Sequence, residues 1–544
     1  MTSDARTIVI GADALDFRYL DEFQDTMPNV DRLRRTGVEA PLRSTFPPWT
    51  ASAWPSMYTG TDPSFHGVYD FFRFDGYPDE GSLVSRNDVQ APAIWNYLTG
   101  EGIPSVVVNV PVTHPAEPIE GVLIPGYLAP EDAAGYPDGV QDELSAALET
   151  PYRIYSRGEV SDDADEKFDG YLDLIELRKR AAVNLLTNRP WRLAILQIQK
   201  TDAVFHNFDD KRSFRKIYEA FDDFVGAVID AIDEEVNVII CSDHGIGPVR
   251  SHRIFVNEVL RRHGYLETTE ADGHESLHID KRRLMEPDPD EPDETSLDES
   301  ILSLAAGALT WTGLPPARLY DLAKALRIEE KVLDLVPASL VRESLAEHVD
   351  WRASSAYCGR ETRLGIRINL EGREPAGVVQ PHDYEQVRTD IIDLLRDLRT
   401  PDGDLAFERV LRRDELYDGP QIDNAPDIIL HPNRMDNSLS TAVYGRQFLP
   451  ENAYDHKLDG VFVGHGPAFD GGATLEQMSL TDVAPVVMAL SGCPVPRRIT
   501  GEVPPGLLSI PTSRRSYDVP YATSSRTTED ESSVTERLED LGYR

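Results

Sequence analysis

The sequence predicts an α/β protein: a doubly wound, mainly parallel central sheet flanked by helices, with an inserted α/β or helical subdomain. Short runs rich in Val and Ile recur along the chain, and such runs are typical of strands that are buried on both faces of a sheet. Amphipathic helical patterns alternate with these runs. Several runs end in Asp or His, and doubly wound sheets bind their ligands beyond the carboxyl ends of the strands.

The individual elements follow one another in an order typical of such a sheet. Strands are expected where apolar runs are bounded by polar or turn-forming residues, and helices where apolar residues recur every three to four positions. In chain order these are the strands TIVIGAD (7–13) and SVVVNVPV (105–112), a helix over 171–188, the strand LAILQIQKTD (193–202), a helix over 214–233, the strand VNVIICSDHG (236–245), a helix over 384–399 and the strand DGVFVGHGP (459–467).

Changes in composition divide the chain into five segments. Residues 1–266 are expected to form the first part of the core, and 446–511 its last part, with the late histidine of the site. Residues 267–350 include the acidic, Pro-containing stretch MEPDPDEPDETSLDES and are interpreted as an acidic linker and helical insert that could act as a lid. Residues 351–445 are expected to be mixed α/β, and 512–544 a loosely ordered tail.

The chain is strongly acidic. Its 544 residues include 94 Asp and Glu against 54 Lys and Arg, a formal net charge of −40. The acidic residues are spread along the chain, which is typical of halophilic proteins because hydrated carboxylates tolerate one another where salt screens their repulsion. An acidic interaction tail is the alternative interpretation. Either way, stable binding to a nucleic acid through bulk electrostatics is disfavoured.

The sequence also favours a cytoplasmic location. It contains no run of eighteen apolar residues, so no transmembrane helix is expected. The N-terminus lacks a basic segment followed by a long apolar one, so it does not resemble a secretory signal. Cys241, Cys358 and Cys493 are widely scattered, as reduced thiols of a cytoplasmic protein would be.

Carboxylate and imidazole side chains gather near the ends of the predicted strands. Asp13 ends the first strand, and Asp243 and His244 follow an apolar strand directly. Asp202 and His206, in TDAVFH, are four residues apart and would share one face of a helical turn. Each cluster has an ordinary alternative, because an Asp after a strand often caps a helix and an Asp–His pair is often a solvated ion pair.

Two further histidines lie near the late strand at 459–467. His456 precedes it and His465 lies near its end. Because the carboxyl ends of parallel strands meet, three Asp and two or three His side chains are expected to converge. Such a set matches a site for two divalent cations with oxygen and imidazole ligands.

The order of these motifs resembles the alkaline phosphatase superfamily, and most closely its type I phosphodiesterase/nucleotide pyrophosphatase branch. The resemblance extends from IVIGAD to LTDVAPVVMALSGCPVP (480–496) and includes a Thr-rich loop, TDAVFH, SDHGIGP, GIRINLEGREPAG, APDIIL and GHGPAF. Ala14 departs from the usual pattern, in which a Gly is common at that place, but its presence removes no ligand.

The resemblance implies a nucleophile in the Thr-rich loop TFPPWTASAWPSMYTG at 45–60. In this branch the nucleophile lies nine residues before the Thr of a Thr-Gly pair, which a His-Gly pair follows. The pairs at 59–60 and 66–67 fit that pattern, and counting back nine residues leads to Thr50. Thr45, which precedes Phe-Pro, is the alternative. Thr50 could also cap a helix, whose N-terminus would favour an incoming phosphate.

The resemblance also implies how the ligands divide between two metal ions. His456 is favoured over His465 as the last ligand, because the metal-binding His of this subgroup precedes the GVFV strand. Zn²⁺ suits these ligand types, with Mn²⁺ as the alternative where carboxylates dominate. The first ion would be held by Asp13, Thr50, Asp243 and His244, and the second by Asp202, His206 and His456.

The function implied is metal-dependent hydrolysis of a small phosphate ester or nucleotide, at a phosphodiester or nucleotide pyrophosphate bond. A metal-activated Thr50 would attack phosphorus and form a covalent phospho-Thr intermediate. The absence of Arg and Lys close to Thr50 in the sequence favours diesters, which carry a single negative charge. Trp54 and Asp70 are candidate substrate contacts.

Other activities on the same scaffold are alternatives: a phosphomonoesterase, a phosphonate hydrolase or a mutase. A sulfatase is less favoured because the loop lacks the Cys-x-Pro-x-Arg pattern of that chemistry. A binding protein that has lost catalysis is also less favoured, since a decayed site would be expected to have lost a ligand. The sequence predicts no oligomeric state.

Overall fold

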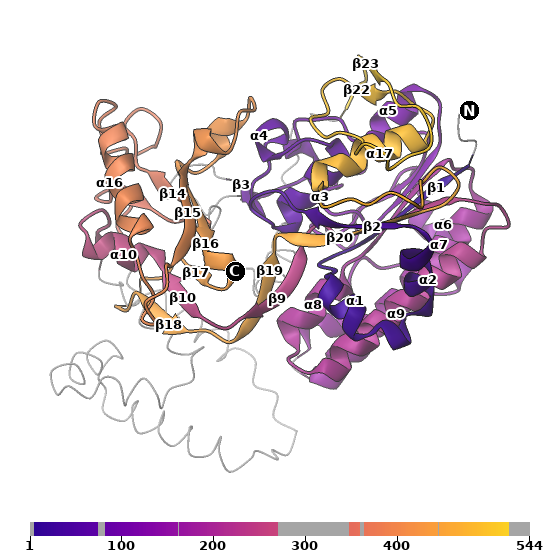
Figure 1. Ribbon diagram of the computed structural model, residues 1–544, viewed down its shortest axis with the longest axis horizontal. Helices are drawn as coiled ribbons and strands as arrows, with labels where there is room; N and C mark the ends of the chain where they lie inside the picture. Colours follow the sequence, from indigo (N-terminus) through magenta and orange to yellow (C-terminus); the bar gives the residue numbers. More distant parts are fainter. Residues whose placement is uncertain are drawn as a thin grey trace, which may run out of the picture.

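The protein is represented by a computed structural model that describes residues 5–73, 82–161, 163–269, 348–359, 364–443 and 445–521. These residues form a large lobe and a small lobe that lie side by side (Figure 1). The insert expected at 267–350 lies outside the described residues except for three residues at each end. The end of the tail, beyond residue 521, is likewise outside them.

An eight-stranded sheet forms the centre of the large lobe. Its strands are β1 (Thr7–Ala12), β2 (Val38–Arg43), β5 (Ser105–Val108), β6 (Gly121–Ile124), β7 (Leu193–Ile198), β8 (Asn237–Cys241), β20 (Asp459–His465) and β21 (Met478–Ser479). Their order is β21-β2-β20-β8-β1-β7-β5-β6. Pairing is parallel from β8 through β6, whereas β20 runs antiparallel to both of its neighbours. The predicted mainly parallel sheet is confirmed.

Helices cover both faces of this sheet, as a doubly wound fold requires. They are α2 (Pro28–Thr36), α3 (Thr50–Thr59), α5 (Ile94–Gly100), α7 (Ala164–Asn188), α9 (Lys211–Asp230) and α17 (Val483–Leu490). Figure 1 shows α2, α7 and α9 on one face and α3, α5 and α17 on the other. The apolar row of α9, with Phe214, Phe221 and Val225 buried, is typical of a helix packed on a core. No helix within the described ranges is long and apolar enough to cross a membrane.

The small lobe has an apolar core of its own. Its elements include β10 (His252–Phe255), α10 (Val256–Arg262), β13 (Ala356–Tyr357), β14 (Gly365–Ile368), α16 (Tyr384–Arg396), β15 (Phe407–Arg412) and β16 (Ile428–Pro432). Strands β13, β14, β16 and β15 form an antiparallel sheet in that order. Helix α10 packs into this core through Val256, Val259 and Leu260, although the sequence assigns it to the first part of the large core. Its apolar residues alone do not reveal which core they enter.

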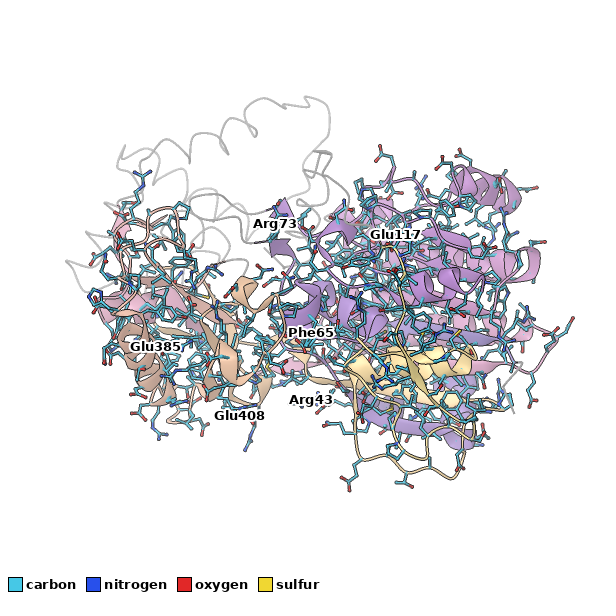
Figure 2. The ribbon with its side chains drawn as sticks, turned by 90° about the horizontal axis from the view of Figure 1, so that it is seen from above. Arg43, Phe65, Arg73, Glu117, Glu385 and Glu408 are labelled. Atoms are coloured by element: carbon cyan, nitrogen blue, oxygen red, sulfur yellow. The ribbon has the colours of Figure 1, made fainter. Side chains whose placement is uncertain are left out.

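Two antiparallel strands, β9 (Gly245–Val249) and β19 (Ala453–Lys457), connect the lobes (Figure 1). The lobes also touch directly, because the Tyr417 hydroxyl donates a hydrogen bond to the Phe46 carbonyl over 2.5 Å. Seen from above, the labelled Phe65 lies on the side of the large lobe that faces the small one, whereas Glu385 lies on the small lobe, away from this junction (Figure 2). The hydrogen bond of Phe46 with Tyr417 shows that the segment just before α3 contacts both lobes.

Candidate two-metal centre

The first set of candidate ligands lies where neighbouring parallel strands end. Asp13 directly follows β1, and Asp243 and His244 come shortly after β8, which pairs with β1 in parallel. Thr50 reaches the same place as the first residue of α3, whose N-cap residue Trp49 makes no side-chain cap. All four side chains are buried.

These side chains are close enough to share one ion. His244 Nε2 lies 3.3 Å from Asp13 Oδ1 and 3.3 Å from Asp243 Oδ2. Thr50 Oγ1 lies 3.4 Å from Asp13 Oδ1 and 3.4 Å from His244 Nε2. Each carboxylate and imidazole offers one ligand atom within 4.8 Å of the others. We call Asp13, Asp243 and His244 the first group.

The second group consists of Asp202, His206 and His456. Asp202 and His206 lie on α8 (Lys200–Asn207), which begins shortly after β7, and His456 lies on β19. His206 Nε2 is 3.2 Å and His456 Nε2 3.6 Å from Asp202 Oδ1. The two imidazole Nε2 atoms are 3.3 Å apart. The two groups adjoin, because the rings of His244 and His456 stack with their centroids 3.8 Å apart.

Backbone carbonyls determine which ring nitrogens are available to a metal. His456 Nδ1 lies 2.8 Å from the Pro48 carbonyl, and His244 Nδ1 lies 3.0 Å from the Gly245 carbonyl. A carbonyl only accepts hydrogen bonds, so each Nδ1 must carry the proton. In the neutral rings, each Nε2 then presents a lone pair toward the carboxylates. Lone pairs facing carboxylate oxygens repel each other unless a cation lies between them, so this donor set fits divalent metal ions.

The charges of the buried groups support the same fit. Burial, and then the neighbouring carboxylates Asp243 and Asp202, raise the pKa of Asp13 well above its usual value. Burial, and then His244, lower the pKa of His456 well below its usual value, which favours the neutral ring. Asp243 Oδ2 is buried without a hydrogen-bond partner in the part of the chain that the structure describes. Bound cations would reduce the repulsion between the carboxylates and would give this unsatisfied oxygen a partner.

Comparison with known proteins identifies the family of the chain. Residues 7–310, more than half of the chain, match the model of the family described as type I phosphodiesterase / nucleotide pyrophosphatase. The chain belongs to this family. Membership in the type I phosphodiesterase/nucleotide pyrophosphatase family confirms the resemblance of the motifs and makes the chain a hydrolase of phosphoester-type bonds. None of the curated proteins compared with it matches.

Solved structures share the fold of this type I phosphodiesterase/nucleotide pyrophosphatase family member. Crystal structures of phosphonoacetate hydrolase from Sinorhizobium meliloti 1021, in complex with phosphonoformate and with phosphonoacetate, each match with a TM-score of 0.52. The sequence identity is 17%, over 90% of this chain and 95% of theirs. At this identity the likeness establishes the shared fold.

The other predicted residues of this family member lie outside the two groups. The Thr45 hydroxyl is buried and has no hydrogen-bond partner among the described residues, whereas Thr50 contacts the first group. His465 lies at the far end of β20, pairs with Val238 and belongs to neither group. His456, and not His465, is the histidine that the structure places beside Asp202.

The two candidate substrate contacts are both buried. Trp54 is 1% exposed, and its indole lies against Gly11 of β1, so a substrate could reach it only after a rearrangement. Asp70 accepts a hydrogen bond from the Phe71 amide over 2.7 Å and lines a small hollow with Phe46 and Tyr417. Neither belongs to the first or the second group.

Some supporting residues were not singled out in the sequence. Gln197 Nε2 donates to Asp13 Oδ2 over 3.4 Å, and the Ala14 amide donates to Asp243 Oδ1 over 3.3 Å. Ala14 adopts a φ of 57°, a left-handed conformation that a Gly would adopt without strain. A polar Gln within the otherwise apolar run LAILQI is the signal that could have revealed Gln197. The contact of the Pro48 carbonyl with His456 Nδ1 has no corresponding signal in the sequence.

Proposed function

We propose that the chain hydrolyses phosphodiester or nucleotide pyrophosphate bonds, with two bound metal ions and Thr50 Oγ1 as the nucleophile. The contact of Thr50 Oγ1 with both Asp13 and His244 is the observation that supports this role best. Oxygen nucleophiles of this kind are weak unless a base or a metal ion activates them. Of the two hydroxyls considered, Thr50 lies beside such an activating site.

The residues present could hold two divalent cations, Zn²⁺ or Mn²⁺. When bound, such ions lower the pKa of a coordinated hydroxyl and stabilise negative charge on the attacking and leaving oxygens. The proposed ligands are those of the first group with Thr50, and those of the second group, which lies beside it.

The chain's own residues prepare the site for an anionic phosphoryl group. Thr50 begins α3, and no side chain caps the first turn, so backbone N–H groups of that turn are available to an anion. Attack by Thr50 Oγ1 on phosphorus would form an O–P bond and expel the leaving oxygen, which gives phospho-Thr50. Water would then hydrolyse this ester and regenerate the hydroxyl.

Phosphonate hydrolysis is the second candidate, because two of the matching solved structures are of a phosphonoacetate hydrolase. A phosphomonoesterase or a mutase would use the same centre, so substrates must separate them. Hydrolysis of bis-p-nitrophenyl phosphate, p-nitrophenyl phosphate and phosphonoacetate should therefore be compared, with metal content measured by mass spectrometry. We expect the diester to be preferred and two equivalents of metal to be bound.

The Thr50→Ala variant tests the nucleophile. It should lower diester hydrolysis by at least about a thousandfold, because catalysis retains only the contributions of binding and charge stabilisation. The Asp and His ligands should still retain metal. Thr45→Ala is the matched control and should keep its activity. A Thr50→Ala protein with wild-type activity would refute the assignment.

A further inference from the structure

We infer that a hollow beside the two-metal centre binds a second, non-reacting anionic group of the substrate, a carboxylate or a phosphate, through Arg178 and Tyr127. This inference rests on the proposed function, because it takes the phosphorus of the substrate to lie at the two groups. It adds to that function a class of substrate: small phosphate or phosphonate compounds that carry another anionic group.

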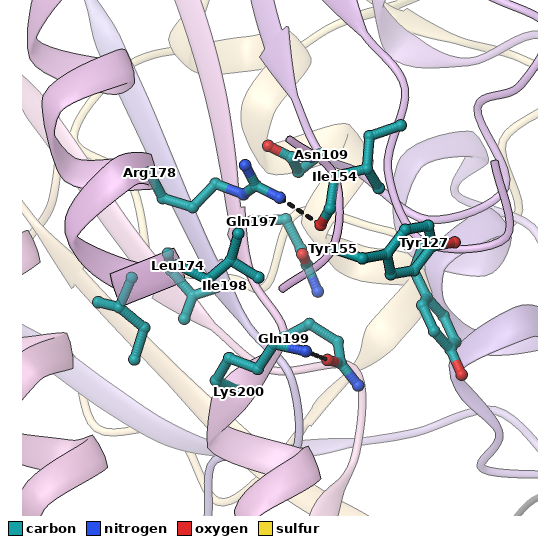
Figure 3. Close-up of a pocket in the computed structure, with 11 residues that line it drawn as sticks. Asn109, Tyr127, Ile154, Tyr155, Leu174, Arg178, Gln197, Ile198, Gln199 and Lys200 are labelled. Atoms are coloured by element: carbon teal, nitrogen blue, oxygen red, sulfur yellow. Dashed lines mark hydrogen bonds between the residues drawn. The ribbon is translucent and has the colours of Figure 1, made fainter. Parts of the chain in front are cut away.

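The hollow adjoins the metal centre along the same edge of the sheet. Asn109 follows β5, Tyr127 follows β6 and Gln197 lies near the end of β7, and all three line it (Figure 3). Gln197 also contacts Asp13 of the first group over 3.4 Å. The empty volume of the hollow is about 360 Å³, which includes space open to solvent. One amide side chain therefore separates this space from a candidate metal ligand.

The lining of the hollow is cationic although the chain is acidic. Arg178 and Lys200 line it, and none of its lining residues is acidic. The charge of Lys200 is already matched, because its ammonium forms a buried ion pair with Glu159 and donates to Gln199 Oε1 over 2.8 Å. The lining of this hollow, with Arg and Lys but no Asp or Glu, contrasts with the net charge of −40 of the whole chain. Arg178 is the cation left for a ligand.

Arg178 is buried without a counterion in the described parts of the chain. It extends from α7, is 6% exposed, and donates to the carbonyls of Arg153 and Ile154 over 2.5 and 2.6 Å (Figure 3 shows the hydrogen bond to Ile154). No described carboxylate lies within 4.0 Å of its guanidinium. A buried cation without an anion destabilises the fold, because it has lost its hydration and gained no opposite charge. A carboxylate or phosphate of the substrate would supply the missing charge and accept its remaining hydrogen bonds.

Tyr127 supplies a second donor. It is 6% exposed, and its hydroxyl has no hydrogen-bond partner among the described residues. Burial, and then Tyr155 and Asp202, raise the pKa of Tyr127 well above its usual value, so the phenol stays protonated. An unpaired buried hydroxyl is destabilising, and an anionic acceptor would satisfy it. Among the residues that the structure describes, Tyr127 thus lacks a hydrogen-bond acceptor, whereas Arg178, which already donates to two carbonyls, lacks a negative charge.

Ligand binding by the full-length, metal-loaded protein tests the inference. Calorimetric titrations should measure the Kd of phosphonoacetate, methylenediphosphonate and ethylphosphonate. Beside the phosphonate that all three share, the first carries a carboxylate, the second another phosphonate, and the third only an uncharged ethyl group. We expect phosphonoacetate or methylenediphosphonate, which each carry a second anionic group, to bind at least tenfold more tightly than ethylphosphonate. Preference for phosphonoacetate would identify a carboxylate, and preference for methylenediphosphonate a phosphate.

Three variants make this comparison specific. Arg178→Met should reduce the preference at least tenfold, and Tyr127→Phe about fivefold, with the Kd of ethylphosphonate unchanged. Tyr127→Phe removes only the unpartnered hydroxyl, so without ligand it should melt at the wild-type temperature or above. Arg180→Met is the matched control, because this exposed arginine of the same helix also donates to a carbonyl, that of Leu148, away from the hollow. Its preference should be unchanged.

Two results would overturn the inference. One is equal affinity for all three compounds. The other is a preference that survives both Arg178→Met and Tyr127→Phe, which would mean that the metal ions alone chelate the second group. Failure of the proposed function gives a different result: bis-p-nitrophenyl phosphate and phosphonoacetate would remain uncleaved while a preference dependent on Arg178 persisted.

Discussion

His66 Nε2 lies 2.8 Å from Ser56 Oγ, and this hydrogen bond connects the His-Gly turn to the helix that begins at Thr50. The Val68 amide donates to His66 Nδ1 over 3.2 Å, so the neutral ring carries its proton on Nε2 and donates to Ser56. The Ser56 hydroxyl in turn donates to the Ser52 carbonyl over 2.8 Å. The histidine that follows the Thr-rich loop therefore supports the helix of the proposed nucleophile.

We predict that His66 makes the fold sensitive to mild acid. Burial, and then Arg86, lower the pKa of His66 to about 3. Between the pKa of an unfolded His, about 6.5, and about 3, the unfolded chain binds a proton that the folded one does not, so stability falls as the pH is lowered through this window. From pH 7 to pH 5.5, urea unfolding should show a loss of about 1 kcal/mol that His66→Gln lacks. The control is His382→Gln, whose side chain is 78% exposed. Equal losses in wild type and His66→Gln would contradict the prediction.

Removal of metal should destabilise the large lobe. The carboxylates of Asp13, Asp202 and Asp243 are fully buried and close together, so a chelator would remove the charge that offsets their repulsion. If the ion is present at about a hundred times its Kd, its removal should lower the free energy of unfolding by about 3 kcal/mol. Differential scanning calorimetry with and without EDTA, followed by return of Zn²⁺ or Mn²⁺, measures this. An unchanged melting temperature after complete removal of metal would argue against the two-metal centre.

Asp202→Asn should remove one metal ion and leave the other. Burial would raise the pKa of Asp202, but the surrounding histidines, His206 above all, lower it, so a carboxylate anion is held there. The neutral amide is a weaker ligand, and the metal content should fall from two equivalents toward one by mass spectrometry. Asp209→Asn, at an exposed position shortly after α8, is the control. Two equivalents in the Asp202→Asn protein would exclude Asp202 as a ligand.

Gly11→Ala should strain the contact between β1 and α3. A Cβ at Gly11 would lie 2.3 Å from Trp54 Cη2, and Trp54 is too buried to move aside. Overpacking of this kind costs roughly 1–3 kcal/mol, and a shift of α3 would displace Thr50 and lower diester hydrolysis. Chemical denaturation and kcat/KM measure both effects.

A double-variant cycle tests the cause of that strain. Trp54→Phe shortens the side chain, so Gly11→Ala with Trp54→Phe should be more stable than the sum of the single effects predicts. Gly471→Ala is the control substitution, since its Cβ would lie 3.7 Å from the nearest atom, the Thr36 carbonyl oxygen. Additive effects of the two changes would show that the indole is not the obstacle.

Much of the fold and the grouping of candidate ligands could be predicted because the signals are local. Asp13, Asp243 and Asp202 each follow a recognisable apolar strand, and parallel pairing alone brings such strand ends together. The motif formed by the nearby Thr-Gly and His-Gly pairs predicts Thr50 as the nucleophile. In the structure, His66 of that motif contacts α3 directly.

The rest depends on contacts that no short stretch of sequence encodes. Arg178 lies within an amphipathic helix, where an arginine is expected to be solvated, and it is buried because the carbonyls of Arg153 and Ile154 receive its guanidinium. Trp54 is a candidate substrate contact in the sequence, but in the structure its indole is buried against Gly11 of β1. Likewise, the apolar face of α10 does not specify which of two cores it joins.

The pairing of β9 with β19 limits how the small lobe can be exchanged between relatives. Gly245 of β9 directly follows His244, and His456 lies within β19, opposite Ile246. The segments that fasten the small lobe thus also set the relative positions of the two histidine rings. A chimaera that exchanges the small lobe with one from a relative must therefore keep residues 245–249 and 453–457 from the same parent, because a mismatch of one residue in their register would separate the first group of candidate ligands from the second.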